Sequence, residues 1–166
     1  MKITLHKKIA AYFGYEFTKI RRKAHQDFGT HLLTLFENLE INCVLDVGAN
    51  MGQYVEQLRK SGYEGKIISF EPIKECYEHL KKSGDDSWEI VNYALGNTEG
   101  EANINVTNKN VFSSILSPNE YAAHRFNQSA QVNHPEKIKI KRLDDVLEDI
   151  LPDYKTRNIF LKHTFC

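Results

Sequence analysis

Hydrophobic and polar positions in the first half of the chain follow two different spacings. Residues 43–47 form a run of apolar and β-branched residues that is too short for a helix and leads into a glycine, which indicates a buried strand. Residues 66–71 and 88–95 have the same texture and are expected to form the second and third strands. Between these strands, helical spacing predicts that six residues point inward: Tyr54, Val55, Leu58, Cys76, Tyr77 and Leu80.

Local signals predict where the helices begin and end. Thr30 is expected to cap a short helix whose apolar positions run from Leu32 to Leu39. The next helix is expected to stop at Ser61-Gly62, since glycine just past the last apolar position is a common helix stop. Pro72 is expected to open the third helix, where its missing N–H costs nothing, and that helix should end near Ser83-Gly84.

Strands and helices that alternate with short links predict an α/β fold with a mostly parallel sheet flanked by helices. The pattern changes after Gly96, where residues 101–107 alternate polar and apolar and could pair with residues 111–116 as a hairpin. Four further segments are expected: a polar loop over 117–137, a strand over 138–142, an acidic helix over 143–151 and a fourth parallel strand over 158–162. The length of 166 residues fits one main domain.

Composition excludes several classes of function. Lysine plus arginine and aspartate plus glutamate both number 22, so binding to nucleic acid through bulk charge is not expected. The three cysteines show no Cys-x-x-Cys spacing, and the seven histidines show no metal-binding motif, so no metal site is predicted. No apolar run approaches the ~20 residues that a membrane span requires.

The N-terminal region, residues 1–29, is basic and amphipathic. Residues 1–25 contain seven lysines and arginines and a single acid, and their apolar residues recur at helical spacing: Leu5, Ile9, Phe13, Phe17 and Ile20. Two interpretations stay open: a helix packed on the domain of residues 30–166, or a helix with weak contact to an anionic membrane surface. The stripe lacks the unbroken apolar stretch of a signal peptide, so we expect a cytoplasmic protein.

The segment most informative about function is residues 44–52, in which a buried strand leads through a Gly-x-x-x-Gly turn into a helix. Ligands of open α/β sheets bind at the carboxyl ends of the strands, where this turn falls. Gly48 and Gly52 have no Cβ, so the backbone there can approach a ligand. Glu71 ends the next strand 23 residues after Gly48, close to the ~20-residue spacing at which an acid binds ribose hydroxyls.

The same turn departs from the known phosphate-binding motifs. The dinucleotide fingerprint requires glycine at positions that Asn50 and Gln53 occupy, and no P-loop is present. The acid that opens the turn, Asp46, suits a cationic ligand better than a pyrophosphate. S-Adenosylmethionine, which has an ammonium and a sulfonium group, is therefore the expected cofactor.

A series of short motifs resembles the FkbM-type S-adenosylmethionine-dependent methyltransferases over about residues 30–162. The shared elements stand here as Asp46-Val47-Gly48-Ala49-Asn50-x-Gly52, Ser69-Phe70-Glu71-Pro72, Ala94-Leu95-Gly96 with Gly100, Ser113-Ser114, Arg142-Leu143-Asp144 and Leu161-Lys162. The resemblance implies a Rossmann-like methyltransferase fold that methylates hydroxyl groups of sugars, polyketides or similar metabolites. A small-molecule or glycan hydroxyl would then be the acceptor.

The resemblance also implies roles for individual residues. Asp46, Gly48, Ala49, Asn50 and Gly52 would hold the methionine part of the cofactor. Glu71 would hold the ribose, and Ala94 and Leu95 would line the adenine pocket. No catalytic base is assigned. His124 and His134 in the polar loop could act as bases or be solvated, and Ser113 and Ser114 could touch substrate or form a turn.

The chain departs from the family pattern after Leu161-Lys162. The family continues with x-Asp-x-x-Gly-x-Glu, whereas this chain has Thr164 in place of the aspartate and ends at Cys166. We therefore expect a fold truncated after its fourth strand, with little activity and an exposed edge at residues 159–161 that favours self-association. The alternative function is a non-catalytic remnant that binds the cofactor or serves as an interaction module.

Overall fold

The fold is described for residues 12, 20–107, 113–114 and 132–164 of a computed structural model. Several sequence predictions concern residues outside these ranges: most of the N-terminal apolar stripe, most of the proposed hairpin partner 111–116, most of the polar loop with His124, and Cys166. The other predicted elements can be compared with the structure.

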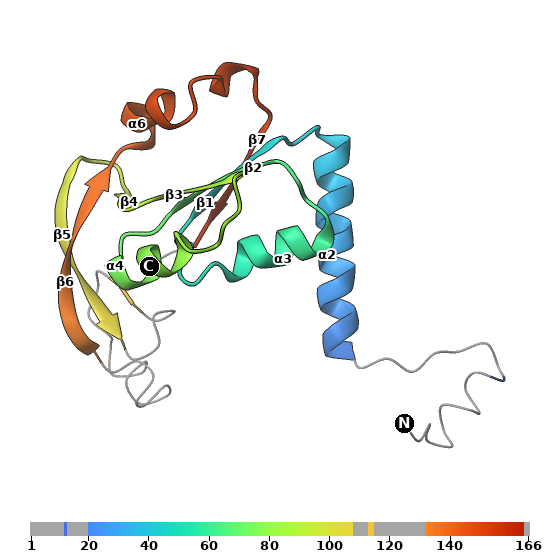
Figure 1. Ribbon diagram of the computed structural model, residues 1–166, viewed down its shortest axis with the longest axis horizontal. Coiled ribbons are helices and arrows are strands. Elements are labelled where there is room, and N and C mark those ends of the chain that lie inside the picture. Colours follow the sequence, from blue (N-terminus) through green and yellow to red (C-terminus); the bar gives the residue numbers. More distant parts are fainter. Residues whose placement is uncertain (1–11, 13–19, 108–112, 115–131, 165–166) are drawn as a thin grey trace.

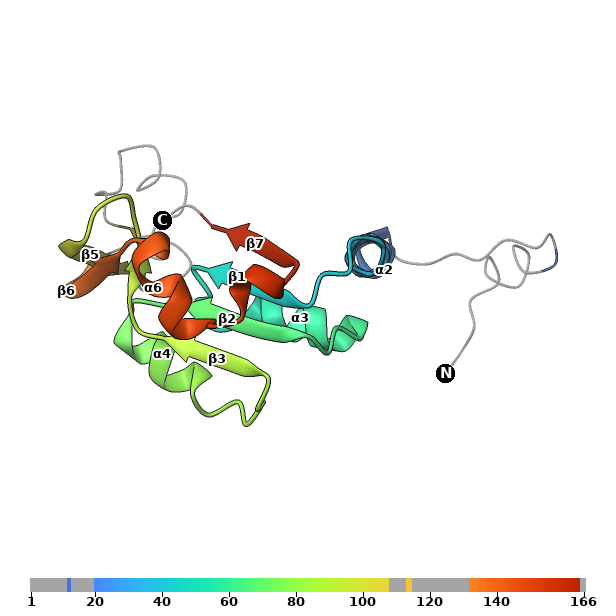
Figure 2. The same ribbon diagram turned by 90° about the horizontal axis from the view of Figure 1, so that it is seen from above.

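The centre of the fold is a four-stranded parallel sheet, as predicted. Its strands are β1 (Cys43–Val47), β2 (Lys66–Phe70), β3 (Trp88–Val91) and β7 (Ile159–His163), in the order β3-β2-β1-β7. Every residue of β1 is buried because strands flank it on both sides and helices cover both faces. Figure 2 shows β7 on the side of β1 away from β2, so the chain order reverses between these two strands.

Helices cover the two faces of this sheet (Figure 1): α3 (Gln53–Ser61) and α4 (Lys74–Leu80) lie on one, α6 (Leu143–Ile150) and the 3₁₀ helix Tyr154–Thr156 on the other. Alternate strand residues therefore enter two different cores. Val44 and Ile67 pack with Val55 and Leu58 of α3. Residues of the opposite face pack with Leu151 and the apolar side of α6: Cys43, Leu45, Ile68 and Phe70.

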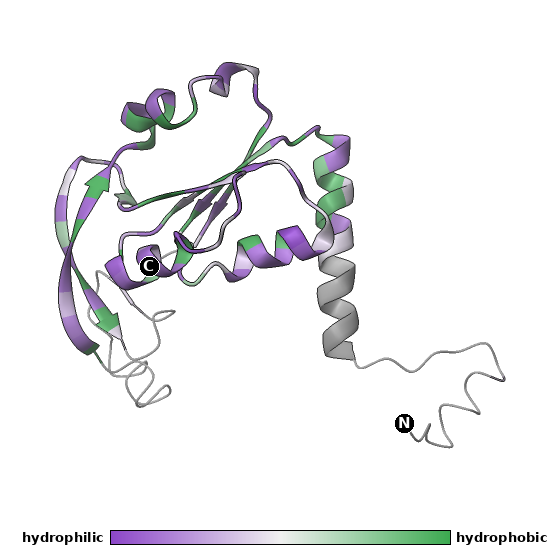
Figure 3. Cartoon of the chain, viewed as in Figure 1, coloured by the Kyte–Doolittle hydropathy of each residue, from purple (hydrophilic) through white to green (hydrophobic). Residues whose placement is uncertain are grey.

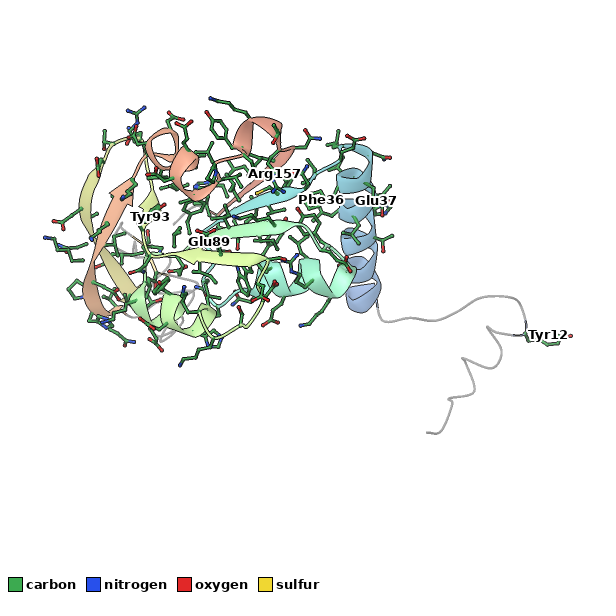
Figure 4. The ribbon with its side chains drawn as sticks, turned by 45° about the horizontal axis from the view of Figure 1, so that its top comes forward. Tyr12, Phe36, Glu37, Glu89, Tyr93 and Arg157 are labelled. Atoms are coloured by element: carbon green, nitrogen blue, oxygen red, sulfur yellow. The ribbon has the colours of Figure 1, made fainter. Side chains whose placement is uncertain are left out.

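The helix predicted from Thr30 is longer than expected. Helix α2 spans Ile20–Asn38, and Thr30 lies inside it, where its carbonyl oxygen accepts a hydrogen bond from the Thr34 hydroxyl at 3.0 Å. Thr30 as N-cap was therefore wrong. The apolar turns of α2 appear as a green band in Figure 3. Phe36 lies on the side of α2 toward the sheet and Glu37 on the other side (Figure 4), and the Phe36 and Phe160 ring centroids are 4.8 Å apart.

The predicted third strand, residues 88–95, divides into two strands of different sheets. β3 ends at Val91, and β4 (Ala94–Leu95) pairs with β6 (Val132–Lys141). Between them the Asn92 side-chain amide donates to the carbonyl oxygens of Glu71 and Pro72, at 2.9 and 3.0 Å. These bonds turn the chain out of the central sheet.

The second sheet has the order β4-β6-β5, where β5 is Gly100–Thr107 and pairs antiparallel with β6. The expected partner of β5 was residues 111–116, of which Ser114 forms an antiparallel bridge to Asn105. Residues 132–137 were assigned to a loop, which was wrong. All of these residues except the half-buried Glu136 are exposed, and all except Val132 and Pro135 are polar, so they lack the alternation of a half-buried strand.

Contacts with α4 hold the second sheet against the first. Ile104, Val106 and Ile138 pack on Ile73 and Cys76, and the Glu136 carboxylate accepts the backbone N–H of Lys74 at 2.8 Å. Helix α4 begins at Lys74, two residues later than the Pro72 start that was predicted. The reason is local: the Ile73 N–H donates to the Glu71 carboxylate, and Ile73 has an extended backbone.

Candidate functional site

A cleft of about 160 Å³ opens at the carboxyl end of the central sheet. One wall consists of residues at the ends of β1, β2 and β7: Val47, Gly48, Phe70, Pro72, His163 and Thr164. The opposite wall comes from the second sheet: Ala94, Leu95, Ile104 and Ile138. The cleft adjoins the point between β1 and β7 where the strand order reverses, which is where open α/β sheets bind their ligands.

The turn after β1 has a left-handed backbone at three positions. Gly48, Asn50 and Gly52 have φ angles of 77°, 52° and 84°. Asparagine tolerates this conformation better than most residues, and the Asn50 side-chain oxygen accepts the N–H of Met51 at 2.8 Å. Gly48 lines the cleft, and its contact with a ligand stays a prediction.

Gly52 is glycine for a different reason from the one the sequence suggested. A Cβ at this position would lie 2.8 Å from both Leu80 Cδ2 and a ring carbon of Trp88. Gly52 therefore packs against core side chains, and it does not line the cleft. Its contact with a cofactor stays a prediction.

Glu71 joins the loop after β1 to the loop after β2. One oxygen of its carboxylate, Oε2, accepts the Asn50 N–H at 2.7 Å, and the other, Oε1, accepts the Ile73 N–H at 2.9 Å. The side chain is 3% exposed, and this burial raises the pKa of Glu71 to about 7 despite the two hydrogen bonds. Glu71 thus lies beside the cleft between two lining residues, Phe70 and Pro72, without lining it.

Asp46 belongs to a row of polar side chains that crosses all four parallel strands. Trp88 Nε1 donates to Ser69 Oγ at 2.9 Å, and Ser69 Oγ donates to Asp46 Oδ2 at 3.2 Å. The other oxygen, Asp46 Oδ1, lies 2.8 Å from Lys162 Nζ. We call Trp88, Ser69, Asp46 and Lys162 the polar row. It lies directly below the turn, since Val47 and Gly48 follow Asp46.

The polar row corrects one part of the sequence argument. Asp46 was treated as a negative charge available to a cationic ligand, but it is fully buried and paired with the Lys162 ammonium. Tyr54 covers this pair from α3, with its ring centroid 5.4 Å from Lys162 Nζ. Burial and the Asp46 carboxylate raise the pKa of Tyr54 to about 12, so Tyr54 is a neutral phenol at physiological pH.

The structure thus brings three of the eight predicted cofactor residues to the cleft: Gly48, Ala94 and Leu95. Asn50 and Glu71 join the two loops beside the cleft. Ala49 packs on Leu80 and Ile90. Asp46 pairs with Lys162, and Gly52 packs against Leu80 and Trp88. The binding role of all eight stays a prediction.

Sequence reasoning missed the apolar lining from the second sheet, Ile104 and Ile138. The alternation in their strands predicts a buried face but not what that face covers. Thr164 was noted only as a departure from the family pattern and His163 was given no role, and both line the cleft.

Other candidate residues have structural roles or lie away from the cleft. Ser113 Oγ accepts the Thr107 N–H at 3.1 Å, and the Ser114 backbone bonds to Asn105, so both serines hold the end of β5. His134 is exposed on β6 and does not line the cleft. Within the described ranges, no group of three or more metal-ligating side chains lies close enough to hold a metal ion.

The fold and the position of the cleft define an α/β protein of the Rossmann-like methyltransferase class. A family model described as the methyltransferase FkbM domain matches residues 46–162, and the chain belongs to this methyltransferase family. Comparisons with curated proteins and with solved structures gave no significant match. Among the described helices, none is long and apolar enough to cross a membrane.

Proposed function

We propose that this methyltransferase uses S-adenosylmethionine and transfers its methyl group to a hydroxyl of a small molecule or glycan. The observation that supports the cofactor most directly is the hydrogen bond between the Asn50 N–H and Glu71 Oε2, 2.7 Å long. It joins a glycine-containing turn to a buried acid at the carboxyl ends of adjacent strands. A nucleoside with an attached amino acid can contact both elements at once.

The residues present suit this cofactor chemically. A carboxylate accepts about four hydrogen bonds, and the Asn50 and Ile73 N–H groups use two, so Glu71 retains capacity for two ribose hydroxyls. Leu95, Ile104 and Ile138 give the cleft the apolar walls that an adenine ring requires. A pyrophosphate fits less well, because the turn lacks the second and third glycines of the dinucleotide motif.

Each part of the site has a separate task in this proposal. The backbone of the turn at Gly48 binds the methionine part, Glu71 binds the ribose, and Ala94 and Leu95 contact the adenine. The bound cofactor supplies an electrophilic methyl group on sulfur. Methyl transfer depends largely on holding the acceptor oxygen in line with that group, so the rigid ends of β1 and β7 are suited to this positioning.

His163 is the candidate base on the acceptor side. Among the described residues that line the cleft, it alone has a side chain that can accept a proton from a hydroxyl group. It follows Lys162 at the end of β7 and pairs in register with Val47, next to Gly48. We therefore place the acceptor hydroxyl on the β7 side of the cleft.

Two measurements test this function. Calorimetric titration with S-adenosylhomocysteine measures binding, and transfer of label from methyl-labelled S-adenosylmethionine to hydroxylated sugars and polyketides measures activity. We expect binding to depend on Glu71 and transfer to depend on His163 as well. Tighter binding of a dinucleotide would contradict the cofactor assignment, and binding without transfer to any acceptor would favour a non-catalytic binding module.

A further inference from the structure

Lys162 is held by three acceptors below the turn that follows β1. Its Nζ lies 2.8 Å from Asp46 Oδ1, 3.2 Å from the Gly48 carbonyl oxygen and 3.4 Å from the Val47 carbonyl oxygen. The two carbonyl contacts are hydrogen bonds, and the contact with Asp46 is an ion pair. The side chain is only 20% exposed, and Tyr54 covers it. Lys162 is therefore fixed in the protein and is not directed at a ligand.

This arrangement determines whether Asp46 adds a negative charge next to the cleft. Asp46 has no exposed surface, so solvent screens its charge poorly. Without the ammonium, the carboxylate would place a negative charge one residue before Val47 and two before Gly48, both of which line the cleft. With the ammonium, the pair has no net charge.

We infer that Lys162 neutralises Asp46, so that Asp46 does not make the cofactor site favour a sulfonium over a neutral thioether. The inference rests on the proposed function, because it concerns S-adenosylmethionine and S-adenosylhomocysteine as ligands. These two compounds differ in the methyl group and positive charge on sulfur. The ratio of their dissociation constants therefore reports the charge that the site presents, while loss of general binding affects both ligands alike.

Substitutions in the pair should move this ratio in opposite directions. Lys162→Met leaves Asp46 unpaired and should shift the ratio toward the sulfonium ligand by about tenfold, the size expected for a unit charge several ångströms away at intermediate dielectric. Asp46→Asn leaves the ammonium unpaired and should shift it about tenfold toward the thioether. The double variant Asp46→Asn/Lys162→Met has no charge here and should restore the wild-type ratio.

The experiment is calorimetric titration of both ligands into the full chain at low ionic strength. Lys60→Met is the matched control, because Lys60 is an exposed residue of α3 that pairs only with Glu56 among the ion pairs found, and its loss should leave the ratio unchanged. Circular dichroism of each variant establishes that it is folded. If a single variant does not fold, the remaining single variant and the wild-type ratio still decide the question.

Three outcomes bear on the inference. Opposite shifts in the two single variants and their cancellation in the double variant support it. A ratio that stays constant in a folded single variant overturns it while the proposed function stands. If the wild-type protein binds neither ligand, the proposed function fails and the inference fails with it.

Discussion

The Asn50 backbone N–H and Glu71 Oε2 form a hydrogen bond of 2.7 Å between two loops that are 21 residues apart in the chain. The Glu71 carboxylate also accepts the Ile73 N–H, so it connects the turn after β1 to the start of α4. The side chain is nearly inaccessible to solvent, which raises the pKa of Glu71 to about 7. The protonation state of Glu71 therefore links the geometry of these two loops to pH.

The first prediction concerns stability. The folded-state pKa of Glu71 lies above its value of 4.5 in an unfolded chain, so the folded protein binds more protons between these values. The free energy of unfolding should therefore fall by up to about 3 kcal/mol as pH rises from about 4.5 to 7, and then level off. Urea unfolding at pH 5, 6, 7 and 8 measures this change.

Two variants isolate the contribution of Glu71. Glu71→Gln removes the titrating group, so the difference between its profile and that of the wild type should contain the predicted fall. Glu64→Gln, at an exposed position, should keep the wild-type profile. A wild-type stability that rises relative to Glu71→Gln across this window would show that Glu71 is not destabilised by its charge.

The second prediction concerns cofactor affinity. Ribose hydroxyls donate to an ionised carboxylate, so binding should lower the pKa of Glu71 and release a proton. The affinity for S-adenosylhomocysteine should therefore increase by about tenfold between pH 6 and pH 8. Calorimetry in two buffers of different ionisation enthalpy detects the proton release.

Glu71→Gln serves again as the comparison for affinity. It should bind about 1.5–3 kcal/mol more weakly at pH 8, because a hydrogen bond to a charged group is lost, and its affinity should not change with pH. Equal affinities of wild type and Glu71→Gln at pH 8 would argue against the ribose assignment.

The third prediction concerns Gly52. Alanine there would have a left-handed backbone, with φ at 84°, and a Cβ 2.8 Å from Leu80 and Trp88. We expect Gly52→Ala to destabilise the protein by about 2–4 kcal/mol, since backbone strain and overpacking add. Gly84→Ala is the control, because Gly84 has φ at 69° but open space around its Cβ, and it should cost only about 1–2 kcal/mol. Equal losses measured by urea unfolding would mean that packing on Trp88 contributes nothing.

The fourth prediction concerns His163. If its imidazole accepts the hydroxyl proton, His163→Ala should lower kcat by about 10²–10⁴-fold and leave cofactor affinity nearly unchanged. His134→Ala, at an exposed position on β6 outside the cleft, should leave both unchanged. Label transfer and calorimetry on the same preparations separate the two effects. A parallel loss of affinity and rate would instead give His163 a role in holding the cofactor.

Much of the central sheet could be predicted because its signals are local. β1 is a continuous apolar run, and the predicted bounds 43–47 match the strand. The stop of α3 at Gly62 was also confirmed, where glycine takes a φ of 106°. Errors occurred where a distant contact competes with the local signal. Val91 ends β3 because Asn92 bonds to the chain at Glu71 and Pro72, 20–21 residues earlier.

The candidate site was predictable in its sequence motifs but not in its contacts. Glu71 and the turn at Gly48 could be identified from spacing, because a parallel sheet brings the ends of successive strands to one edge. The partner of Asp46 could not, since Lys162 is 116 residues further along the chain and meets it only through the pairing of β1 with β7. Ile104 and Ile138 of the second sheet were missed as lining residues of the cleft for the same reason.

The sequence by itself determined the α/β class, the position of the turn and the acid that follows β2, because strand runs, glycine positions and helix stops depend on neighbouring residues. Tertiary structure alone decided that the Asp46 charge is neutralised, that Gly52 faces Trp88, and that Ile104 and Ile138 close the cleft. These properties depend on which side chains meet across strands and sheets. Burial and charge pairing arise from these tertiary contacts, and local residue patterns do not specify the contacts.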